Sequence, residues 1–249
     1  MKPPTKTGCW VAGLIMIVAR TTAAQPEAAW TSLFDGRSLQ GWFVKSVEAD
    51  RNENFWSVVD GTIEVNSIGR ADHDYVWLIT EDEFADFELR LAFQAYREST
   101  GNSGVQVRSR YDESPSAPGG GWLDGPQVDL HPPLPWRIGM IYDETRTERR
   151  WISPSLPDWN VDASYGPDEW IFRYSDEGDG WNDLWITCRG TRITVMLNGV
   201  RMNFYDGRGV LDDSAHRELD VGLQGHIALQ LHTGDELMMR FRDIIVREY

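Results

Sequence analysis

The sequence predicts an all-β sandwich or jelly roll, built as a single domain. Short segments of alternating apolar and polar residues recur at near-regular spacing, and Gly, Asn, Asp and Pro residues separate them. After residue 24, no segment shows a sustained helical period with capping residues. The chain also lacks an internal repeat of roughly 20–50 residues. Many short strands separated by turn residues are typical of antiparallel sandwiches and jelly rolls.

The first predicted strands lie in the N-terminal half of the chain. Residues 55–65 place a Val-Asp-Gly-Thr turn between two strand-like halves, which predicts a hairpin. Residues 84–96 alternate Phe and Leu with polar residues, and residues 104–110 and 125–131 repeat this alternation over shorter lengths. Because side chains of a strand alternate between two faces, each segment would bury one face and leave the other polar.

The C-terminal half predicts further strands after two long loops. Residues 184–205 form two or three strands joined by Arg-Gly-Thr and Asn-Gly, and residues 226–248 form two strands around Thr-Gly-Asp. Residues 111–126 and 143–183 are rich in Gly, Pro, Trp and acidic residues and are predicted as loops. Long loops in a compact domain commonly carry function, and the Trp content favours ordered ones.

The N-terminus has the pattern of a secretory signal peptide, residues 1–24. Lys2 and Lys6 precede a short apolar run, and Thr22-Ala23-Ala24 offers small residues for cleavage. The alternative is an uncleaved membrane anchor, but the run is shorter than the ~20 residues that span a bilayer. We expect a mature domain of residues 25–249, periplasmic or secreted and with no membrane association after cleavage.

Charge and cysteine content narrow the function classes. The net charge of −15 disfavours nucleic acid as a partner, because an acidic chain repels phosphate backbones. Cys188 is the one cysteine left after cleavage, so no internal disulfide can form, which suits a bacterial periplasm. The sequence has no HExxH, CxxC, Walker or GxSxG motif. It also lacks the laminarinase-like carboxylate triplet, which disfavours ordinary two-carboxylate glycoside hydrolysis.

Three predicted strands share one polar design. Their polar sides carry Gln106, Arg108 and Arg110 in the first, Gln127, Asp129 and His131 in the second, and Gln230 and His232 in the third. A solvent-facing side of an antiparallel sheet would show the same alternation. Amides, guanidinium, carboxylate and imidazole without Lys nevertheless suit a ligand with many hydroxyl groups. If these strands are neighbours, the sheet presents a carbohydrate site, onto which some of the 12 Trp residues could stack sugars.

An ordered set of segments resembles the 3-keto-disaccharide hydrolase family. The segments include WTSLFDGRSLQGWF (30–43), WSVVDGTIEV (56–65), FADFELRLAF (84–93), NSGVQVRS (102–109), GPQVDL (125–130), IGMIYDE (138–144), WNDLWITCRG (181–190) and IALQLHTGDELMMRFRDIIVRE (227–248). The resemblance implies a concanavalin A-like jelly-roll sandwich exported from bacteria. It also implies cleavage of glycosides whose carbon 3 is a ketone. One branch of the family resembles this chain at Tyr142, Asp143, Glu144, Arg149 and Arg150.

The resemblance suggests a mechanism that the polar residues permit. A ketone at carbon 3 acidifies the hydrogen on carbon 2, and removal of that proton allows the glycosidic oxygen to leave carbon 1. Such a step needs a base and a stabiliser for the oxyanion. We expect His232 or Asp129 to be the base and Arg108 to stabilise the oxyanion. The expected substrate-binding residues are Gln127, His131, Tyr142, Glu144 and Gln230.

Two alternatives remain open at this stage. A divalent cation held by Asp129, His131, Glu144 and His232 could stabilise the enolate instead of a guanidinium. The protein could also be a non-catalytic, lectin-like carbohydrate-binding module, or a structural or adhesive exported domain, because fold alone does not give function. A binding module needs stacking and hydroxyl contacts but no convergent base and guanidinium. A base and a guanidinium group that converge on the polar face would therefore favour an enzyme over a binding module or a structural domain.

Overall fold

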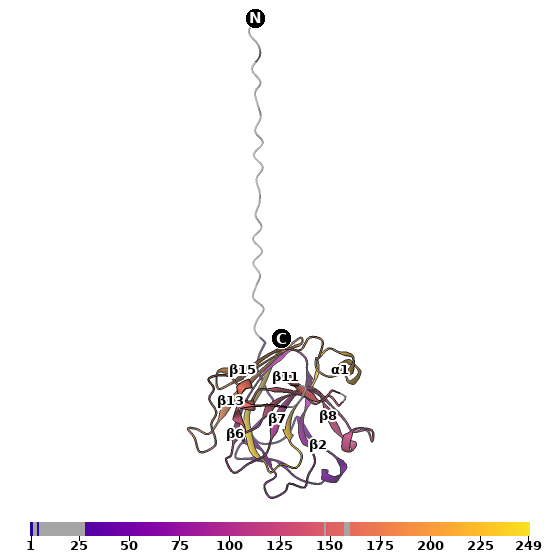
Figure 1. The fold of residues 1–249 in the computed structure, drawn as a ribbon, viewed down its shortest axis with the longest axis vertical. Coiled ribbons are helices and arrows are strands. Elements are labelled where there is room, and N and C mark those ends of the chain that lie inside the picture. The colour runs from indigo at the N-terminus through magenta and orange to yellow at the C-terminus, as the bar shows by residue number, and fades with distance from the viewer. Residues whose placement is uncertain (2–3, 5–27, 147, 157–159) are drawn as a thin grey trace.

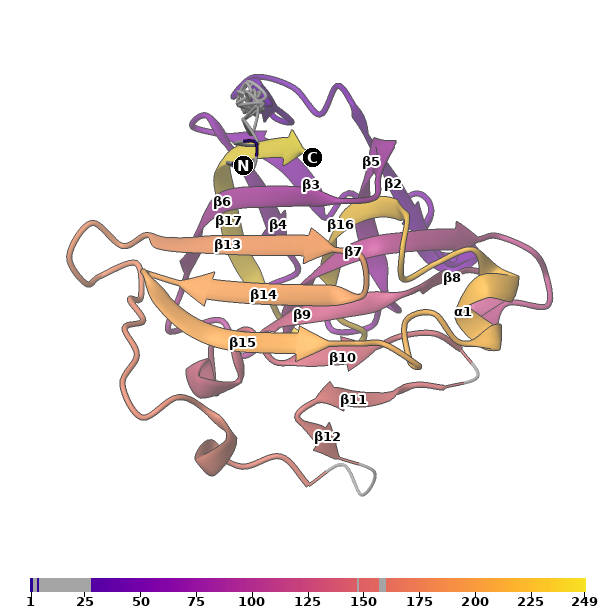
Figure 2. The ribbon, with the colours of Figure 1, turned by 90° about the horizontal axis from the view of Figure 1, so that it is seen from above.

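The computed structural model describes residues 1, 4, 28–146, 148–156 and 160–249, and these form a β-sandwich. Two antiparallel sheets face each other, as Figures 1 and 2 show from two directions. The predicted all-β sandwich is confirmed. The predicted signal peptide, apart from residues 1 and 4, lies outside the described residues.

One sheet contains the C-terminal strand, which is the longest of the described strands. In spatial order its strands are β15 (Val200–Asp206), β14 (Arg192–Leu197), β13 (Asn182–Arg189), β6 (Phe87–Ala95), β17 (Met238–Glu248), β4 (Thr62–Asn66) and β3 (Trp56–Val59), with β1 (Thr31–Ser32) beside β17. In Figure 2, β13, β14 and β15 lie side by side. Residues 184–205 thus form parts of three strands, within the range that the sequence predicted.

The opposite sheet carries the polar strands. In spatial order its strands are β12 (Ser155–Leu156), β11 (Arg150–Ser153), β10 (Ile141–Asp143), β9 (Pro126–Leu130), β7 (Ser103–Asp112), β16 (Gly225–Leu231), β5 (Val76–Phe84) and β2 (Trp42–Ser46), with β8 (Trp122–Asp124) beside β7. The strands β9, β7 and β16 are neighbours, which is the arrangement that the three polar segments require. The two predicted strands of residues 226–248 are β16 and β17, and they enter opposite sheets.

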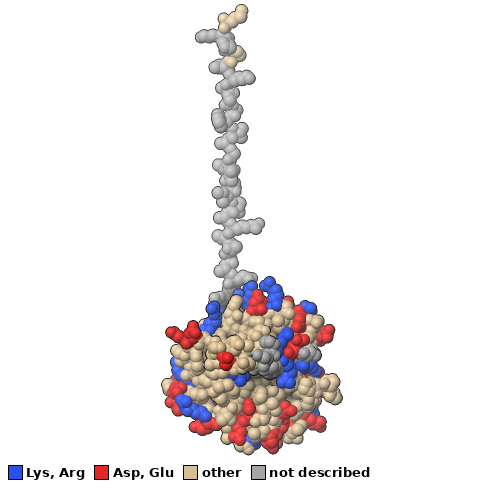
Figure 3. All heavy atoms as spheres, in the orientation of Figure 1, with Lys and Arg blue, Asp and Glu red and all other residues tan. Residues whose placement is uncertain are grey.

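Helices play a minor part in the described fold. They are α1 (Ser214–Leu219) and the 3₁₀ turns η1 (Glu48–Asp50), η2 (Pro118–Gly120), η3 (Pro135–Arg137) and η4 (Ala163–Tyr165). In the described ranges, no helix combines the length and apolar character that crossing a membrane requires. Basic and acidic side chains intersperse on the face drawn in Figure 3, as expected from a chain with charges of both signs.

The main core lies between the sheets and contains apolar side chains from both of them. Phe87, Leu89 and Phe93 of β6 are fully buried there, as their alternation predicts. Val128 and Leu130 of β9 point into the same core from the opposite sheet. Since side chains alternate along a strand, Gln127 and Asp129 must point to the outer face of that sheet.

Two segments that the sequence predicted as loops also contain short strands. Residues 111–126 include β8, and residues 143–183 include β11 and β12. This part of the loop prediction was wrong, because strands of two to four residues are too short to show an alternation. β8 pairs with β7 and β11 pairs with β10, so both extend the second sheet.

Candidate active site

A pocket opens on the outer face of the second sheet. It is lined by Tyr75, Asn102, Gln127, Asp129, Arg137, Tyr142, Glu144, Arg149, Trp151 and His232. The side chains at its base are buried rather than solvated: the exposed fractions of Gln127, Asp129 and Glu144 are 2%, 1% and 4%. The polar face is therefore not an ordinary solvent-facing side of a sheet. Buried polar groups that converge in a pocket are typical of a ligand site.

Gln127 and Asp129 enter this pocket because of their register on β9. Opposite Asp129 on β7 stands Gly104, and the side chain of Gln127 lies against it. A Cβ atom at position 104 would overlap the Gln127 side chain, so a residue without a side chain is required there. The Oε1 atom of Gln127 and the Oδ1 atom of Asn102 are buried and have no hydrogen-bond partner among the described residues.

The buried carboxyl group of Asp129 forms an ion pair with the partly exposed Arg137, which lies in the η3 turn after β9. The Arg137 Nε and Asp129 Oδ2 atoms are 3.1 Å apart. Burial raises the pKa of Asp129 to about 6, although the charges of Arg137 and His232 oppose this shift. Asp129 is thus a carboxyl group that can exchange a proton near neutral pH.

Glu144 follows β10 and lies beside the second guanidinium of the pocket. Its Oε2 atom is 3.8 Å from Nε of Arg149, and the ring of Trp122 donates a 2.8 Å hydrogen bond to its backbone oxygen. Burial raises the pKa of Glu144 to about 7, against the lowering effect of Arg149 and His232. The amide of Gln230 lies next to this carboxyl group. Burial also raises the pKa of Tyr142, two residues earlier on the same face.

His232 is held by a carboxylate on one side and faces the pocket on the other. Its Nδ1 atom is 3.1 Å from Oδ2 of Asp235, and its Nε2 atom is 3.2 Å from the hydroxyl of Tyr75. Burial alone would lower the pKa of His232, but the hydrogen bond and charge of Asp235, with the charge of Glu144, raise it overall. The raised pKa favours the imidazolium, which is the form that can act as an acid.

Replacement of Asp235 by Asn is expected to lower the pKa of His232. The variant removes the charge and weakens the hydrogen bond that favour the imidazolium. The ring-proton chemical shifts of His232, followed by NMR against pH, measure this change. Asp220→Asn, a change at a distant turn, is the matched control and should leave His232 unchanged. An unaltered His232 titration in Asp235→Asn would show that Asp235 does not set its protonation.

Two predicted substrate-binding residues lie next to the pocket rather than in its lining. Gln230 is buried on β16 beside Glu144. His131 follows β9, and its Nδ1 atom is buried without a hydrogen-bond partner among the described residues. Burial, together with the charge of Arg137, lowers the pKa of His131 to about 4, so this ring is neutral near pH 7. Gln127, Asp129, Tyr142, Glu144 and His232 do share one pocket.

The placement of Arg108 on this polar face was wrong. Ser109 pairs with His226 and Gln106 with Ala228, so Val107 and Arg108 together oppose one residue of β16. This bulge, with φ of 54° at Arg108, reverses the alternation. The fully buried side chain enters the gap between the sheets instead.

The guanidinium of Arg108 is satisfied far from the pocket lining. It donates hydrogen bonds to the carbonyl oxygens of Ala85, Gly190 and Gly222 and forms an ion pair with Asp86 at 3.0 Å. These contacts join both sheets at one end of the sandwich. Arg108 is therefore positioned to stabilise the fold rather than an oxyanion in the pocket.

Several pocket residues were missed by the sequence interpretation. They are Tyr75, Asn102, Arg137 and Trp151. Asp235, which holds His232 but is not part of the lining, was also missed. Arg137 lies in the η3 turn and Asp235 lies in the connection between β16 and β17, so no strand alternation assigns either side chain a face. Asn102 directly precedes the polar strand β7, and Asp235 lies three residues after His232. Proximity to a polar strand end was the available signal.

The alternative hypothesis was a divalent cation bound by Asp129, His131, Glu144 and His232. Within the described ranges, no three His, Cys, Asp or Glu side chains converge closely enough to hold a metal ion. In the pocket, Arg137 and Arg149 instead lie next to the two carboxyl groups. Guanidinium groups in such positions can balance negative charge that develops on a ligand.

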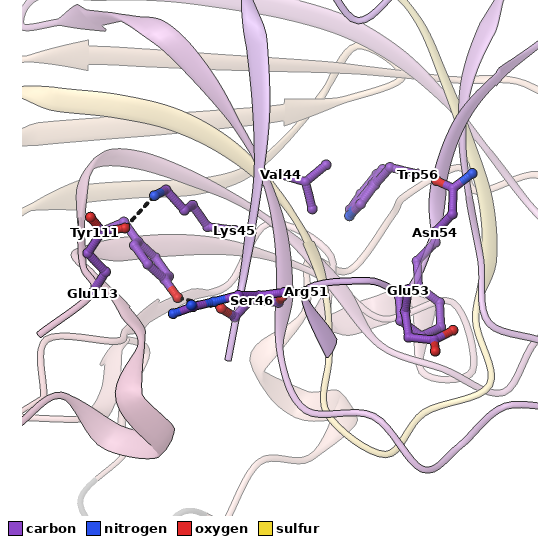
Figure 4. Close-up of a pocket in the computed structure, with 10 residues that line it drawn as sticks. Val44, Lys45, Ser46, Arg51, Glu53, Asn54, Trp56, Tyr111 and Glu113 are labelled. Atoms are coloured by element: carbon purple, nitrogen blue, oxygen red, sulfur yellow. Dashed lines mark hydrogen bonds and ion pairs between the residues drawn. The ribbon is translucent and has the colours of Figure 1, made fainter. Parts of the chain in front are cut away.

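A larger hollow lies between the sheet edges, at β2 and β3 (Figure 4). Its volume is about 610 Å³, against about 100 Å³ for the polar pocket. Lys45 on its wall is paired with Glu113, as the dashed line in Figure 4 shows. Its two lining carboxyl groups, Glu53 and Glu113, are exposed rather than buried, and no histidine is among the residues that line it. We therefore place the candidate site in the smaller pocket on chemical grounds.

Comparison with protein families identifies the chain. Residues 29–247 match the family described as the 3-keto-alpha-glucoside-1,2-lyase-like domain. The chain belongs to this family. Membership indicates a carbohydrate-related activity and a glycoside-acting enzyme. The family match covers both sheets and every pocket residue.

Solved structures share the fold of this family member. Two candidate glycosyl hydrolases of Parabacteroides distasonis are 17% and 20% identical, with TM-scores of 0.54 and 0.51. The alignments cover 88% and 89% of this chain and 94% and 100% of those chains. A Bacillus subtilis protein of unknown function with a galectin-like fold is 11% identical, with a TM-score of 0.51 over 90% of this chain and 97% of its own. These likenesses support the concanavalin A-like sandwich. No curated protein sequence matches the chain significantly.

Proposed function

We propose that the protein is an enzyme that cleaves glycosidic bonds of 3-keto glycosides by removing the proton on carbon 2. One observation carries the proposal: two buried carboxyl groups and a carboxylate-held histidine converge in a single pocket with two guanidinium groups. The pKa values of the carboxyl groups, about 6 and about 7, suit proton transfer near neutral pH. A pocket that only bound sugars would not need such groups.

Glu144 is the proposed base. The pKa of Glu144, about 7, is higher than the pKa of Asp129, about 6, so the Glu144 carboxylate is the stronger base. Its contact with Arg149, at 3.8 Å, is also longer than the 3.1 Å contact between Asp129 and Arg137. Glu144 takes the proton from carbon 2, and the electron pair forms an enolate whose charge lies on the ketone oxygen.

His232 is the proposed acid. Protonated and held by Asp235, it directs Nε2 towards the pocket, beside Tyr75. The enolate collapses to restore the ketone, a double bond forms between carbons 1 and 2, and the bond to the glycosidic oxygen breaks. The leaving oxygen takes the proton from His232. Water then adds to the double bond, or the unsaturated sugar is released. Asp129, Gln127 and Arg137 orient the sugar hydroxyls.

Incubation with a 3-keto glucoside in deuterated water tests the proposal. We expect the product to be either an unsaturated 3-keto sugar or a free 3-keto sugar with deuterium at carbon 2. NMR spectroscopy of the reaction mixture identifies which product forms. The corresponding glucoside without a ketone is the matched control and should stay intact, because its carbon 2 proton is not acidic. Equal cleavage of both glucosides, or a free 3-keto sugar with hydrogen retained at carbon 2, would contradict the mechanism. Saturable binding without any product would favour the lectin-like module.

We also propose that the enzyme acts outside the cytoplasm, in the periplasm or the medium. The signal-peptide pattern of residues 1–24 supports this location. Cell fractionation of a producing bacterium, with mass determination of the mature N-terminus, would test both export and cleavage near Ala24.

A further inference from the structure

A buried charged cluster lies behind the pocket wall, on the core side of β10. His216 of α1 and Asp143 have no exposed side-chain area, and the His216 Nε2 and Asp143 Oδ2 atoms are 3.2 Å apart. The same nitrogen is 3.2 Å from Oγ1 of Thr145, while Nδ1 is 2.9 Å from Oδ1 of Asp213. One imidazole thus connects the helix to the two residues on either side of Glu144.

The alternation of the chain explains why this cluster can act on the pocket. Tyr142 and Glu144 point into the pocket, whereas Asp143 points the other way and meets His216. The backbone of Glu144 is also fixed, because its N–H donates to Gly125 at 3.0 Å and its oxygen accepts from Trp122. Those two bonds leave the direction of the Glu144 side chain to the backbone angles on either side of it, so a displacement of Asp143 or Thr145 would move the Glu144 carboxyl group.

We propose that His216 is a positioning residue that fixes the Glu144 carboxyl group in the pocket by holding Asp143 and Thr145. This inference rests on the proposed function, in which Glu144 is the base. Proton abstraction depends steeply on the distance between base and substrate, so a small displacement of Glu144 should slow the reaction strongly. His216 itself lies outside the pocket lining and does not touch the substrate.

The charged groups around His216 predict an effect on the pKa of Glu144, which a merely structural role of His216 would not produce. Asp143 and Asp213 face His216, Arg150 lies 4.0 Å from Asp213, and Tyr205 lies near Asp143. Burial lowers the pKa of His216, but the hydrogen bonds and charges of Asp143 and Asp213 raise it overall, which favours an imidazolium that balances the charge of Asp143.

The protonation of Glu144 depends on Asp143, because the negative charge of Asp143 raises the pKa of Glu144. Removing the imidazolium leaves the carboxylate of Asp143 unbalanced and should raise the pKa of Glu144 above about 7. Removing the carboxylate itself should lower that pKa. Arg149 and His232, the other charged neighbours of Glu144, are untouched by either change.

The experiment compares His216→Gln and Asp143→Asn, with His226→Gln as the matched control. His226 lies on β16 beside Phe43 and Glu83, away from the pocket lining. Kinetics on a 3-keto glucoside should show kcat reduced about 10- to 100-fold in His216→Gln with KM nearly unchanged. Carbon-13 NMR of labelled glutamate, assigned with Glu144→Gln, should show the Glu144 pKa rising in His216→Gln and falling in Asp143→Asn. The control should change neither quantity.

The outcomes separate this inference from the proposed function. If the wild-type protein cleaves the 3-keto glucoside and His216→Gln matches it in kcat and in Glu144 titration, His216 has no positioning role while the function stands. If the wild type cleaves no 3-keto glucoside, the proposed function fails, and the NMR titration still decides whether His216 and Asp143 control Glu144. Shifts of the Glu144 pKa in the same direction in both variants would overturn the inference.

Discussion

Glu144→Gln is expected to reduce kcat on a 3-keto glucoside by about 10³-fold, the range attributed to general acid–base catalysis. Glutamine keeps the shape of the side chain but cannot accept the proton, so KM should change little. In the wild type, kcat/KM should fall below pH about 7, because protonation of Glu144 removes the base. It should also fall above the raised pKa of His232, where the acid loses its proton.

The pH profile distinguishes Glu144 from the second carboxyl group. Glu144→Gln should abolish the acidic limb in the residual activity, whereas Asp129→Asn should retain a limb near pH 7. Both variants should remain folded by circular dichroism. If Glu144→Gln keeps its turnover and Asp129→Asn loses it, Asp129 is the base and the assignment given above is wrong.

Arg108→Leu is expected to lower the free energy of unfolding by about 3 kcal/mol without changing the activity of the folded protein. The variant leaves three carbonyl oxygens, of Ala85, Gly190 and Gly222, without their buried donor. Each buried polar group that loses its partner costs roughly 1–3 kcal/mol. Urea denaturation of the two proteins measures the difference, and turnover is compared per folded molecule.

Arg110→Leu is the matched control for this prediction. Arg110 is two residues along β7 and pairs with Glu83, with about a third of each side chain exposed, so its loss should cost under ~1 kcal/mol. A catalytic role for Arg108 would appear as the opposite pattern: loss of turnover in Arg108→Leu with stability maintained. That result would support the role in oxyanion stabilisation that the sequence analysis predicted for Arg108.

The sequence predicted those features of the site that depend on local periodicity. Val128 and Leu130 face the core while Gln127 and Asp129 face the pocket, because a period of two requires nothing beyond an uninterrupted strand. The same argument placed His232, the residue that directly follows β16, in this pocket. The resemblance to the family supplied Tyr142, Glu144 and Arg149, which the alternation alone had not singled out.

The remaining features depend on information that a local pattern does not contain. A bulge changes the face of every residue beyond it, and nothing in GVQVRSR marks the left-handed backbone at Arg108. Arg137 reaches Asp129 through the η3 turn, and Tyr75, which is 157 residues away from His232 in sequence, reaches that imidazole from the position directly before β5. Such approaches depend on the path of the whole chain, so residue spacing does not predict them.

The buried oxygens of Gln127 and Asn102 have a consequence for substrate choice. A sugar that offers hydroxyl groups to these acceptors compensates them, whereas a deoxy analogue of equal shape leaves them desolvated inside the complex. The loss of binding free energy is then larger than the contribution of the missing hydrogen bond, because the buried acceptor without a partner also carries a desolvation cost. Discrimination by this enzyme should therefore be sharpest between sugars that differ by one oxygen atom.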